Sequence, residues 1–261
     1  MKKNSFTSVQ KSNNGISRIT LNDPDTYNSM SFNMLNSFIS DFKVLDKDKK
    51  TRVIVIEGSG KGFSAGHNLK EVRSLKGKSN YQKLFNLCSQ LMMLIINSNK
   101  PVIAKVHGAA FAAGCQLVAT CDLALSTSDA KFCTPGVNIG LFCSTPMVAL
   151  SRNVSRKKAM RMLITGEPIS AQYAKEIGLI NDYFDSLKLE EEVLKLAETI
   201  ISKSTKVVKI GKSAFYKQLS MPLDEAYKYT SRVMSENMMS LDAKEGISAF
   251  LEKRSPKWKD K

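Results

Sequence analysis

The chain has 261 residues, of which 43% are hydrophobic and 24% charged, and 39 lysines and arginines against 24 aspartates and glutamates give a net charge of +15. This composition is that of an ordinary globular protein, and no apolar run reaches the ~18 residues that a membrane-spanning helix needs. The two histidines, and five cysteines without a CxxC pair, exclude a histidine-rich or zinc-finger type of metal site.

The first half of the chain alternates β-rich segments with segments of helical periodicity. The predicted strands are bounded by Gly, Pro, Asn and Asp, and they cover 15–22, 52–60, 101–108 and 121–127. The predicted helices between them cover 30–45 and 81–96. This alternation predicts βαβ units, and the apolar runs VIVI and VIAKV predict central strands that are buried on both faces of a sheet.

Helical patterns dominate from about Ser144 onward. The predicted helices cover 155–165, 171–178, 189–202, 206–218 and 224–251, and one short strand covers 179–184. No linker rich in Pro, Gly or Ser separates the two parts of the chain, and the sequence has no internal repeat. We therefore expect an α/β core over residues 1–200 and a helical C-terminal region over residues 201–261, packed on this core or on a neighbouring subunit.

The basic charge suits a polyanionic partner, either nucleic acid or a phosphate-bearing cofactor such as coenzyme A. The lysines are spread along the chain and are not interleaved with aromatic residues as RNA-binding motifs require, so we expect a solvated basic surface and no nucleic-acid interface. The N-terminal segment MKKNSFTSVQKSNNG lacks an apolar core and an arginine-rich amphipathic pattern. We expect a cytoplasmic protein, or a mitochondrial one if a presequence has been removed.

The segment EGSGKGFSAGHNLKEV, residues 57–72, forms a glycine-rich loop between a strand and a helix. Asn68 followed by Glu71 resembles a capping box at the helix start. The N–H groups ahead of this helix, including that of His67, are expected to be unpaired and directed outward, where the helix dipole favours negative charge.

The segment HGAAFAAGCQLVATCDLAL, residues 107–125, repeats this arrangement after the strand that ends near Gly108. A helix is expected to begin near Ala113, with Gln116 one turn further along the same face. Its small residues let a ligand approach the backbone closely. Free N–H groups from the two segments, if they converge, would polarise one carbonyl oxygen, as an oxyanion hole does.

These two segments resemble the paired signatures of the crotonase (enoyl-CoA hydratase/isomerase) superfamily. The segments FCTPGVNIGL, LITGEPISAQYAKEIGLIN and EGISAFLEKRSPKWKD match it further along, so the resemblance covers essentially the whole chain in order. It implies an α/β fold, a ClpP-like spiral of ββα units with a helical C-terminal trimerisation region. It also implies an acyl-CoA or enoyl-CoA ligand, no tightly bound cofactor or metal, a role in fatty-acid metabolism, and a homotrimer or dimer of trimers.

Carried over by position, the resemblance assigns the oxyanion-hole amides to His67 and Ala113. The residues that it implies in binding coenzyme A are Ala65, His67, Asn68, Leu69, Lys70, Gly114, Trp258 and Lys259. Lys70 would lie near the nucleotide, together with Trp258 and Lys259 from the same or another subunit. The three phosphate groups of coenzyme A would then account for the positive net charge.

Both catalytic glutamates of the family's hydratases are missing. One should lie three residues after the second oxyanion-hole position and the other after the proline of a QPE motif, and these places hold Gln116 and Gly136. Adding water to a double bond needs a base and an acid, and a neutral amide cannot accept the proton from water. The loss of each such group costs about 10² to 10⁴-fold in rate, so efficient hydration is not expected.

Three alternatives to weak lyase or isomerase activity stay open. A non-catalytic acyl-CoA binding or regulatory protein needs no glutamate. Some naphthoate synthases of the superfamily bind bicarbonate as the base where Gly136 stands, and here Thr134 would lie beside it and Cys143 would replace an aspartate. RNA binding on the same scaffold is supported only by charge.

Several polar residues have both a structural and a functional interpretation. The aspartate of dienoyl isomerases falls on Ser144, which together with Cys143 and Asn138 would line the acyl end of the site. Ser144 is equally a candidate helix N-cap, with Pro146 in the first turn. The His67 ring is a candidate catalytic group, a cap or a solvent-facing side chain, while His107 and Asp122 are expected to be structural. The methionines Met92, Met93, Met160 and Met162 are expected to fill the core or an interface, although methionine is also adaptable enough to line an acyl pocket.

Overall fold

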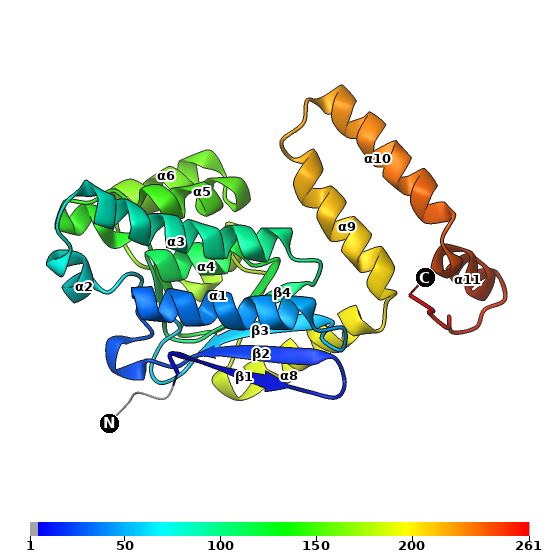
Figure 1. The fold of residues 1–261 in the computed structure, drawn as a ribbon, viewed down its shortest axis with the longest axis horizontal. Coiled ribbons are helices and arrows are strands. Elements are labelled where there is room, and N and C mark those ends of the chain that lie inside the picture. The colour runs from blue at the N-terminus through cyan, green and yellow to red at the C-terminus, as the bar shows by residue number, and fades with distance from the viewer. Residues whose placement is uncertain (1–4, 261) are drawn as a thin grey trace.

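A six-stranded sheet forms the centre of the computed structural model, which describes residues 5–260 (Figure 1). The strands lie in the order β1-β2-β3-β4-β6-β9. All neighbours are parallel except the antiparallel hairpin of β1 and β2 at one edge. The strand bounds are β1 (Thr7–Lys11), β2 (Ile16–Leu21), β3 (Val53–Gly58), β4 (Val102–Val106), β6 (Leu123–Thr127) and β9 (Asp182–Phe184).

A second, smaller sheet has the order β5-β7-β8, with bounds β5 (Ala109–Phe111), β7 (Lys131–Cys133) and β8 (Ile169–Ser170). Strands β4 and β6 are each followed by one of its strands and then by a helical segment, so the chain repeats a ββα unit. The expected βαβ alternation is therefore present, with extra short strands that the sequence pattern did not predict.

The central sheet is buried on both faces, as its apolar runs predict. One face, which includes Ile54 and Ala104, packs on the helices α1 (Phe32–Lys47), α3 (Lys78–Asn97) and α4 (Ala113–Thr120). The other face, which includes Val55 and Ile103, packs on α8 (Ser186–Ile201). Successive strand residues point to opposite faces, so an uninterrupted apolar strand needs helices on both sides.

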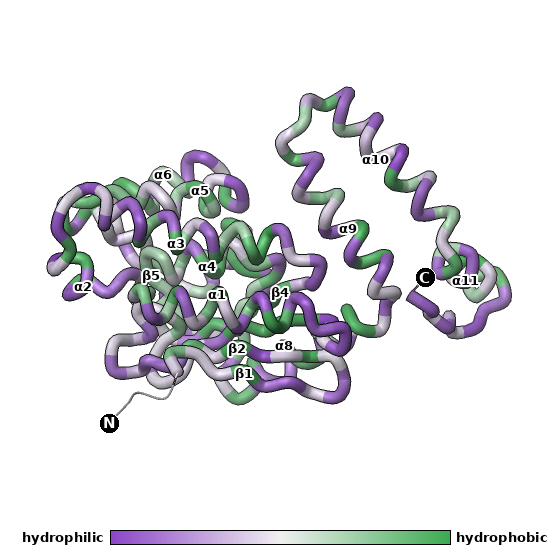
Figure 2. The backbone as a smooth tube through the Cα atoms, viewed as in Figure 1, coloured by the Kyte–Doolittle hydropathy of each residue, from purple (hydrophilic) through white to green (hydrophobic). Residues whose placement is uncertain are grey.

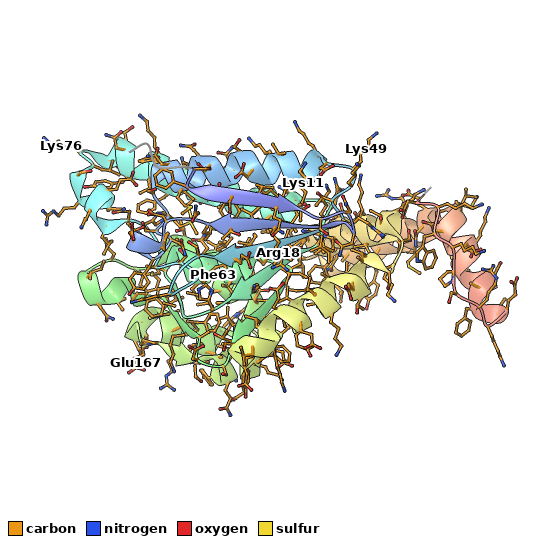
Figure 3. The ribbon with its side chains drawn as sticks, turned by 90° about the horizontal axis from the view of Figure 1, so that it is seen from below. Lys11, Arg18, Lys49, Phe63, Lys76 and Glu167 are labelled. Carbon is orange, nitrogen blue, oxygen red and sulfur yellow. The ribbon has the colours of Figure 1, made fainter. Side chains whose placement is uncertain are left out.

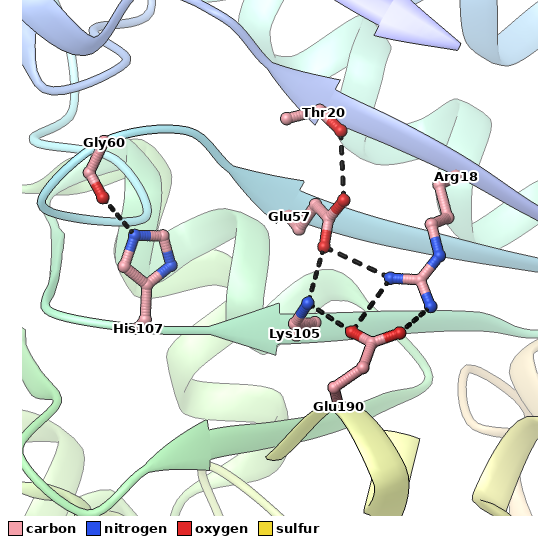
Figure 4. A network of polar contacts seen from close by, with 7 residues as sticks. All are labelled: Arg18, Thr20, Glu57, Gly60, Lys105, His107 and Glu190. Carbon is pink, nitrogen blue, oxygen red and sulfur yellow. Dashed lines mark hydrogen bonds and ion pairs between the residues drawn. The ribbon is translucent and has the colours of Figure 1, made fainter. Parts of the chain in front are cut away.

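A group of four charged side chains joins α8 to the sheet (Figure 4). Lys105 Nζ lies 2.9 Å from Glu57 Oε2 and 2.5 Å from Glu190 Oε2. Arg18 bonds both carboxylates as well. The two positive and two negative charges balance, and the network joins three strands of the sheet, β2, β3 and β4, to α8. Figure 4 also shows His107, whose Nε2 lies 2.9 Å from Gly60 O, so the ring has a hydrogen-bond partner as expected, although the residue is half-buried and not in the core.

The remaining helices before the C-terminal region are α2 (Leu69–Ser74), α5 (Ser144–Asn153), α6 (Arg156–Thr165) and α7 (Ala171–Glu176), with short 3₁₀ turns at Pro24–Thr26 and Pro135–Ile139. Within residues 5–260, no helix is both long and apolar enough to cross a membrane. Figure 3 shows Lys49 and Lys76 projecting from the periphery, in keeping with a basic charge that is spread over the surface.

The C-terminal region consists of α9 (Thr205–Gln218), α10 (Leu223–Met238) and α11 (Leu241–Leu251). Figure 1 shows α9 and α10 as a hairpin that stands off the core, with α11 at the far end, and Figure 2 shows hydrophobic and hydrophilic residues alternating along both helices. Lys212 Nζ on α9 lies 2.6 Å from Asp122 Oδ2, and the hydroxyl of Tyr216 donates to Asp122 Oδ1 at 2.9 Å. Asp122 is therefore structural, as expected, and anchors α9.

One predicted helix is wrong in extent. The pattern over 224–251 predicts a single helix, but α10 ends at Met238 and α11 begins at Leu241. Ser240 accepts a hydrogen bond from the N–H of Ala243 at 3.1 Å and caps α11. The apolar periodicity continues through the break, so the serine cap was the only sequence signal for it. The expected division at residue 200 falls at the end of α8 and stays a prediction.

Candidate functional site

The two glycine-rich loops interlock through backbone hydrogen bonds. The N–H of Ser64 donates to Ala109 O at 3.0 Å, and the N–H of Phe111 donates to Ser64 O at 2.8 Å. Phe63 donates to His107 O at 2.9 Å, and its side chain is fully buried within the body of the molecule (Figure 3). The expected convergence of the two segments is therefore present.

Two glycines permit this close approach. A Cβ on Gly114 would lie 2.3 Å from Ser64 O, and a Cβ on Gly66 would lie 2.7 Å from Ala112 Cβ. Gly66 also has a φ of +89°, which side chains rarely tolerate. Any larger residue at either position would push the loops apart.

The N–H groups of His67 and Ala113 have no hydrogen-bond acceptor in the described chain. Ala113 is the first residue of α4, and the preceding Ala112 has the rare backbone angles φ 47° and ψ −113°. Strained backbone of this kind persists where the surrounding structure enforces it and is frequent at functional sites. The pair meets the first requirement for an oxyanion hole, which is two free donors on adjoining loops.

A cavity of about 380 Å³ opens beside these amides. It brings together most of the predicted site residues, and its wall is predominantly apolar. The lining residues are Ala65, His67, Leu69, Val72, Phe85, Ala112, Ala113, Pro135, Gly136, Asn138, Ile139, Leu141, Phe142, Cys143, Ser144, Thr145 and Pro146. No lining residue is an aspartate, a glutamate, a lysine or an arginine, so the cavity suits an uncharged apolar group.

The place of the second glutamate is filled by backbone. A Cβ on Gly136 would lie 2.5 Å from Leu141 O and 2.9 Å from Cys143 Sγ. Gly140 has a φ of +74°, and the N–H of Leu141 donates to Gly136 O at 2.9 Å, so the chain folds back on itself here. Gly136 itself lines the cavity, so the expected bicarbonate site on that side stays a prediction. Thr134, expected to help hold it, is fully buried and donates to Met162 O at 2.9 Å.

Gln116 lies on α4, one turn after Ala113, and is only 4% exposed. Its Oε1 is buried and accepts no hydrogen bond from any residue between 5 and 260. An uncharged amide in this place can orient a ligand or a water molecule but cannot take up a proton at neutral pH. The first glutamate position therefore holds a polar side chain that cannot act as a base.

The ring of His67 is held in the cavity wall, and the expectation that it caps a helix or faces solvent is wrong. Its Nδ1 lies 3.0 Å from Met30 O, and Phe85 packs edge-on against the ring at a centroid distance of 5.4 Å. Nε2 is buried and has no partner in the described chain. Burial lowers the pKa of His67, although the bond to Met30 opposes this shift.

Cys143 and Ser144 lie in the cavity wall as expected, at the start of α5. Burial raises the pKa of the Cys143 thiol, so this side chain is neutral and cannot replace an aspartate as a base. Ser144 is the first residue of α5 and not its N-cap, because its hydroxyl donates to Phe142 O at 3.3 Å and caps no N–H. Pro146 does lie in the first turn.

The expected capping box at α2 is half formed. Asn68 Oδ1 accepts from the N–H groups of Lys70 and Glu71, both at 3.1 Å. Glu71 does not return the bond, because its carboxylate accepts from the N–H of Phe32 instead. Asn68, Lys70, Gly114 and Gln116 do not line the cavity.

Within one chain, Trp258 and Lys259 lie far from Lys70 at the start of α2 (Figure 1). Trp258 Nε1 donates to Ser202 O at 2.7 Å, and the N–H of Lys259 donates to Asp242 Oδ1 at 2.7 Å. Both residues follow α11, which Figure 1 places at the opposite end of the molecule from α2. Binding of one nucleotide by Lys70 and by Trp258 of the same chain is therefore excluded, and the alternative with another subunit stays a prediction.

Sequence reasoning missed several residues of the cavity wall, among them Val72, Phe85 and Phe142. Phe85 belongs to the helical periodicity of α3, which does not distinguish a cavity-facing residue from a core residue.

Among the described residues, no cluster of three or more His, Cys, Asp or Glu side chains could hold a metal ion.

Comparisons with known proteins agree with this architecture. The family model described as "Enoyl-CoA hydratase/isomerase" matches residues 11–261. The "Enoyl-CoA hydratase domain-containing protein 3, mitochondrial" of Rattus norvegicus is 48% identical over 244 residues, covering 94% of this chain and 81% of that protein. The mitochondrial enoyl-CoA hydratase of Pongo abelii is 32% identical over 249 residues, covering 95% of this chain and 85% of that protein.

Solved structures give the same result. An enoyl-CoA hydratase of Mycobacterium smegmatis superimposes with a TM-score of 0.96 at 45% identity, covering 98% of this chain and 99% of that one. The human enoyl coenzyme A hydratase domain-containing protein 3 superimposes with a TM-score of 0.93 at 47% identity, covering 97% and 100%. The segments AAGCQL and GLFCSTP resemble the sequences of this last group, and the identities to its members confirm that similarity. The chain has the crotonase fold and belongs to the enoyl-CoA hydratase/isomerase family.

Proposed function

We propose that the protein binds an acyl-CoA thioester, with the thioester carbonyl oxygen at the N–H groups of His67 and Ala113 and the acyl chain in the apolar cavity. The free N–H groups and the uncharged lining support this proposal. Two backbone donors polarise a carbonyl without any side-chain chemistry. Lys70, exposed at the start of α2, is the cation offered to the phosphates of coenzyme A.

Hydration of an enoyl thioester is expected to be slow. The observation that carries this conclusion is the backbone oxygen of Leu141, 2.5 Å from the point where a Gly136 side chain would begin. With an amide at Gln116 as well, the site lacks a strong acid and a strong base. A residual lyase or isomerase activity in fatty-acid metabolism remains our leading proposal, carried by carbonyl polarisation alone.

A series of acyl-CoA and enoyl-CoA esters of increasing chain length tests this proposal. Each ester is titrated into the protein by calorimetry and in a thermal-shift assay, and the products are analysed by mass spectrometry. We expect apolar esters to raise the melting temperature more than free coenzyme A does, because the chain fills the cavity. If no ester binds more tightly than coenzyme A, the proposed ligand site is wrong.

The same experiment separates a weak enzyme from a non-catalytic acyl-CoA binding or regulatory protein. The absence of a side chain at Gly136 favours the second candidate, since binding needs no proton transfer. Tight binding without any product after prolonged incubation would establish it. Slow formation of a hydroxyacyl or isomerised product, stoichiometric with enoyl-CoA consumed, would establish a weak enzyme.

We propose that the protein assembles as a homotrimer or a dimer of trimers through its C-terminal helices. Large apolar side chains are exposed there, including Leu223 at 75% and Phe250 at 83%, and contiguous exposed apolar surface marks interaction sites. Light scattering during gel filtration should give three or six times the mass of 28.9 kDa. A monomer at micromolar concentration would refute the assembly.

Two other expectations receive less support. Bicarbonate-assisted chemistry would have to use the cavity side of Gly136, because the direction of a side chain there is blocked by Leu141 O. Turnover that is unchanged in degassed buffer would dismiss it. RNA binding rests on net charge alone, and a salt-insensitive or absent gel shift would dismiss it.

The curated relatives in rat and human carry "mitochondrial" in their names, so we propose the mitochondrion as the compartment. The cytoplasmic expectation is unsupported.

A further inference from the structure

Helix α6 carries a basic surface that the proposed acyl-CoA site does not use. Five of the ten residues 152–161 are lysine or arginine, and no aspartate or glutamate occurs from residue 130 to residue 166. Figure 1 shows α6 beside α5 and apart from the α9–α10 hairpin, through which we propose assembly. The cations are therefore concentrated near one helix, and no acidic neighbour in the sequence neutralises them.

Six exposed side chains form two adjacent lines along α6. Residues four positions apart lie on one side of a helix. The first line is Arg156, Met160 and Ile164, and the second is Lys157, Arg161 and Thr165. The two lines adjoin, because Lys157 and Met160 are only three positions apart. We call these six residues the α6 face.

The two apolar residues of the α6 face are not used by the core. Met160 is 51% exposed and Ile164 is 59% exposed. The helix packs on the core through a different side, which holds Ala159, Met162 and Leu163. A helix surface that combines exposed aliphatic side chains with lysine and arginine is suited to the boundary between lipid headgroups and acyl chains.

The charges of the α6 face are only weakly compensated. Arg156 and Lys157 form no ion pair with any carboxylate of residues 5–260. Arg161 Nη2 lies 3.8 Å from Glu167 Oε2, and these side chains are 69% and 66% exposed. An exposed pair at this distance contributes little to stability, so the positive potential of the face is available to an anionic surface.

A groove of about 280 Å³ adjoins the α6 face, between α6 and α7. Arg161 and Thr165 belong both to the face and to the groove, and Lys158 adds a second cation to the lining. Glu167 also lines the groove, and Lys158 Nζ has an exposed partner in Glu176 at 3.8 Å. The lining therefore holds two cations against one carboxylate, which suits a phosphate group beside Lys158 and Arg161.

An anionic bilayer offers a partner to both kinds of side chain. Its headgroups attract the cations, and the hydrocarbon beneath them receives the aliphatic groups. RNA also offers phosphates, but its bases stack on aromatic or planar side chains, and α6 has no aromatic residue. A free phosphate ion would leave Met160 and Ile164 exposed. The bilayer is therefore the occupant that accounts for the whole face.

We propose that the α6 face docks the protein on a bilayer that contains anionic phospholipid. Met160 and Ile164 enter the headgroup boundary, and one lipid phosphate lies in the groove beside Lys158 and Arg161. The protein then lies on the membrane without crossing it. This inference does not depend on the binding of acyl-CoA, because no residue of α6 lines the apolar cavity.

The test measures how much of the whole chain floats with lipid vesicles. One set of vesicles is phosphatidylcholine alone, and in the other about one third is replaced by phosphatidylglycerol, which makes the surface negative. We expect binding to the second set only. The partition coefficient should fall as the salt concentration rises from about 0.05 M to about 0.5 M, because salt shortens the range of the attraction.

The double variant Arg156→Gln/Lys157→Gln tests the cations. Each lysine or arginine near an anionic bilayer raises the partition coefficient by about fivefold, so the loss of two should lower it by about 25-fold. The matched control, Lys49→Gln/Lys50→Gln, removes the same net charge. Figure 3 places Lys49 on the opposite side of the core from Glu167, which adjoins the α6 face, so this control should keep the wild-type value.

The double variant Met160→Ser/Ile164→Ser tests the insertion of apolar groups. It keeps the charge and should lower the partition coefficient by about tenfold, since two aliphatic groups no longer leave water. The control Met93→Ser/Leu187→Ser removes apolar groups that are 52% and 94% exposed on other helices, and it should have no effect. Melting temperatures show that each variant is folded.

The outcomes that overturn the proposal are distinct. If the wild-type protein does not bind the anionic vesicles, α6 is not a membrane surface. An equal loss in the Lys49→Gln/Lys50→Gln control would show that only net charge matters. Wild-type binding by Met160→Ser/Ile164→Ser would reduce the face to a site for any polyanion, and RNA binding that requires Arg156 and Lys157 would name RNA as the occupant.

The groove is tested by Lys158→Gln, which lies beside the α6 face and not on it. We expect its partition coefficient to fall by about fivefold. An unchanged value would overturn the placement of a lipid phosphate in the groove.

Discussion

Two parts of the cavity wall differ in what they offer a ligand: one has free backbone N–H groups, and the other has no carboxylate where the family's hydratases have a glutamate. The wall formed by the interlocked loops keeps free N–H groups at His67 and Ala113, and Gly66 and Gly114 permit its tight packing. The part of the wall at Gly136 carries no carboxylate, and Leu141 O lies where a side chain at Gly136 would begin. Polarising a carbonyl needs only the backbone, whereas moving a proton needs particular side chains. The proposed carbonyl binding therefore does not depend on the two glutamate positions.

The largest effect should come from separating the interlocked loops. In Gly114→Ala the new methyl group would lie 2.3 Å from Ser64 O, so the loops must move apart. We expect the free energy of unfolding to fall by about 1–3 kcal/mol and acyl-CoA binding to be lost. Urea unfolding and calorimetry measure the two quantities.

The matched control for that variant is Gly211→Ala, on α9, where an added Cβ meets nothing within 4 Å. This change should stabilise the helix by about 0.5–1 kcal/mol, since alanine is the better helix former, and leave acyl-CoA affinity intact. Equal binding by Gly114→Ala and wild type would show that the close contact of the loops does not set the site.

A glutamate introduced at position 136 should not restore hydration. In Gly136→Glu the first side-chain atom would meet Leu141 O at 2.5 Å, so the backbone must rearrange before a carboxylate can enter the cavity. We expect the free energy of unfolding to decrease by about 1–3 kcal/mol, with no gain in crotonyl-CoA hydration. A variant as stable as the wild type with measurable hydration would show that the turn is adaptable.

Gln116 should be easier to convert, because glutamate has nearly the same shape. Gln116→Glu places a carboxylate one turn after the Ala113 amide, but position 116 does not line the cavity and Gly136 supplies no acid. We therefore expect hydration of crotonyl-CoA to rise by no more than about tenfold, against the about 10² to 10⁴-fold that a positioned base contributes when its partner is present. Gln116→Met, which adds no base, is the control and should show no increase. Equal rates in the two variants would mean that position 116 does not face the reacting atoms.

The smallest effect concerns pH and the buried ring of His67. Its pKa is lowered from 6.5 by burial, so below pH 6.5 the unfolded chain binds a proton that the folded chain does not. The free energy of unfolding should therefore fall as the pH decreases from about 6.5 to the folded-state pKa, by at most about 1.4 kcal/mol per pH unit. Urea unfolding between pH 5 and 7.5 measures it.

His67→Gln should remove this slope, and His107→Gln should leave it in place. The carboxylate of Glu190, whose pKa is lowered from 4.5 by its bonds to Lys105 and Arg18 despite burial, titrates below this window. A slope that survives in His67→Gln would assign the proton to another group.

The central elements could be predicted because a buried parallel strand needs an uninterrupted apolar run. This is why VIVI and VIAKV identified β3 and β4. Strand β1 was missed because most of its residues are exposed and polar, and β5, β7 and β8 are too short to show a period. The split between α10 and α11 was missed because apolar spacing continues through Ser240.

The site was predictable where a motif fixes the backbone and unpredictable where contacts between distant residues decide. The loops containing His67 and Ala113 followed from their glycine patterns. The close approach of Leu141 O to Gly136 depends on the turn at Gly140. The residue type at position 136 does not predict that contact. The bond from His67 to Met30 likewise joins segments 37 residues apart.

The most direct test of the central claim measures binding and hydration of one ligand on one sample of the wild-type protein. Crotonyl-CoA is titrated by calorimetry, and the same mixture is followed for loss of the enoyl group and for uptake of ¹⁸O from labelled water. Retained carbonyl polarisation with lost proton transfer predicts saturable binding tighter than that of free coenzyme A, with hydration at least about 10²-fold slower than in a relative that has both glutamates. Hydration at the rate of that relative would contradict the account.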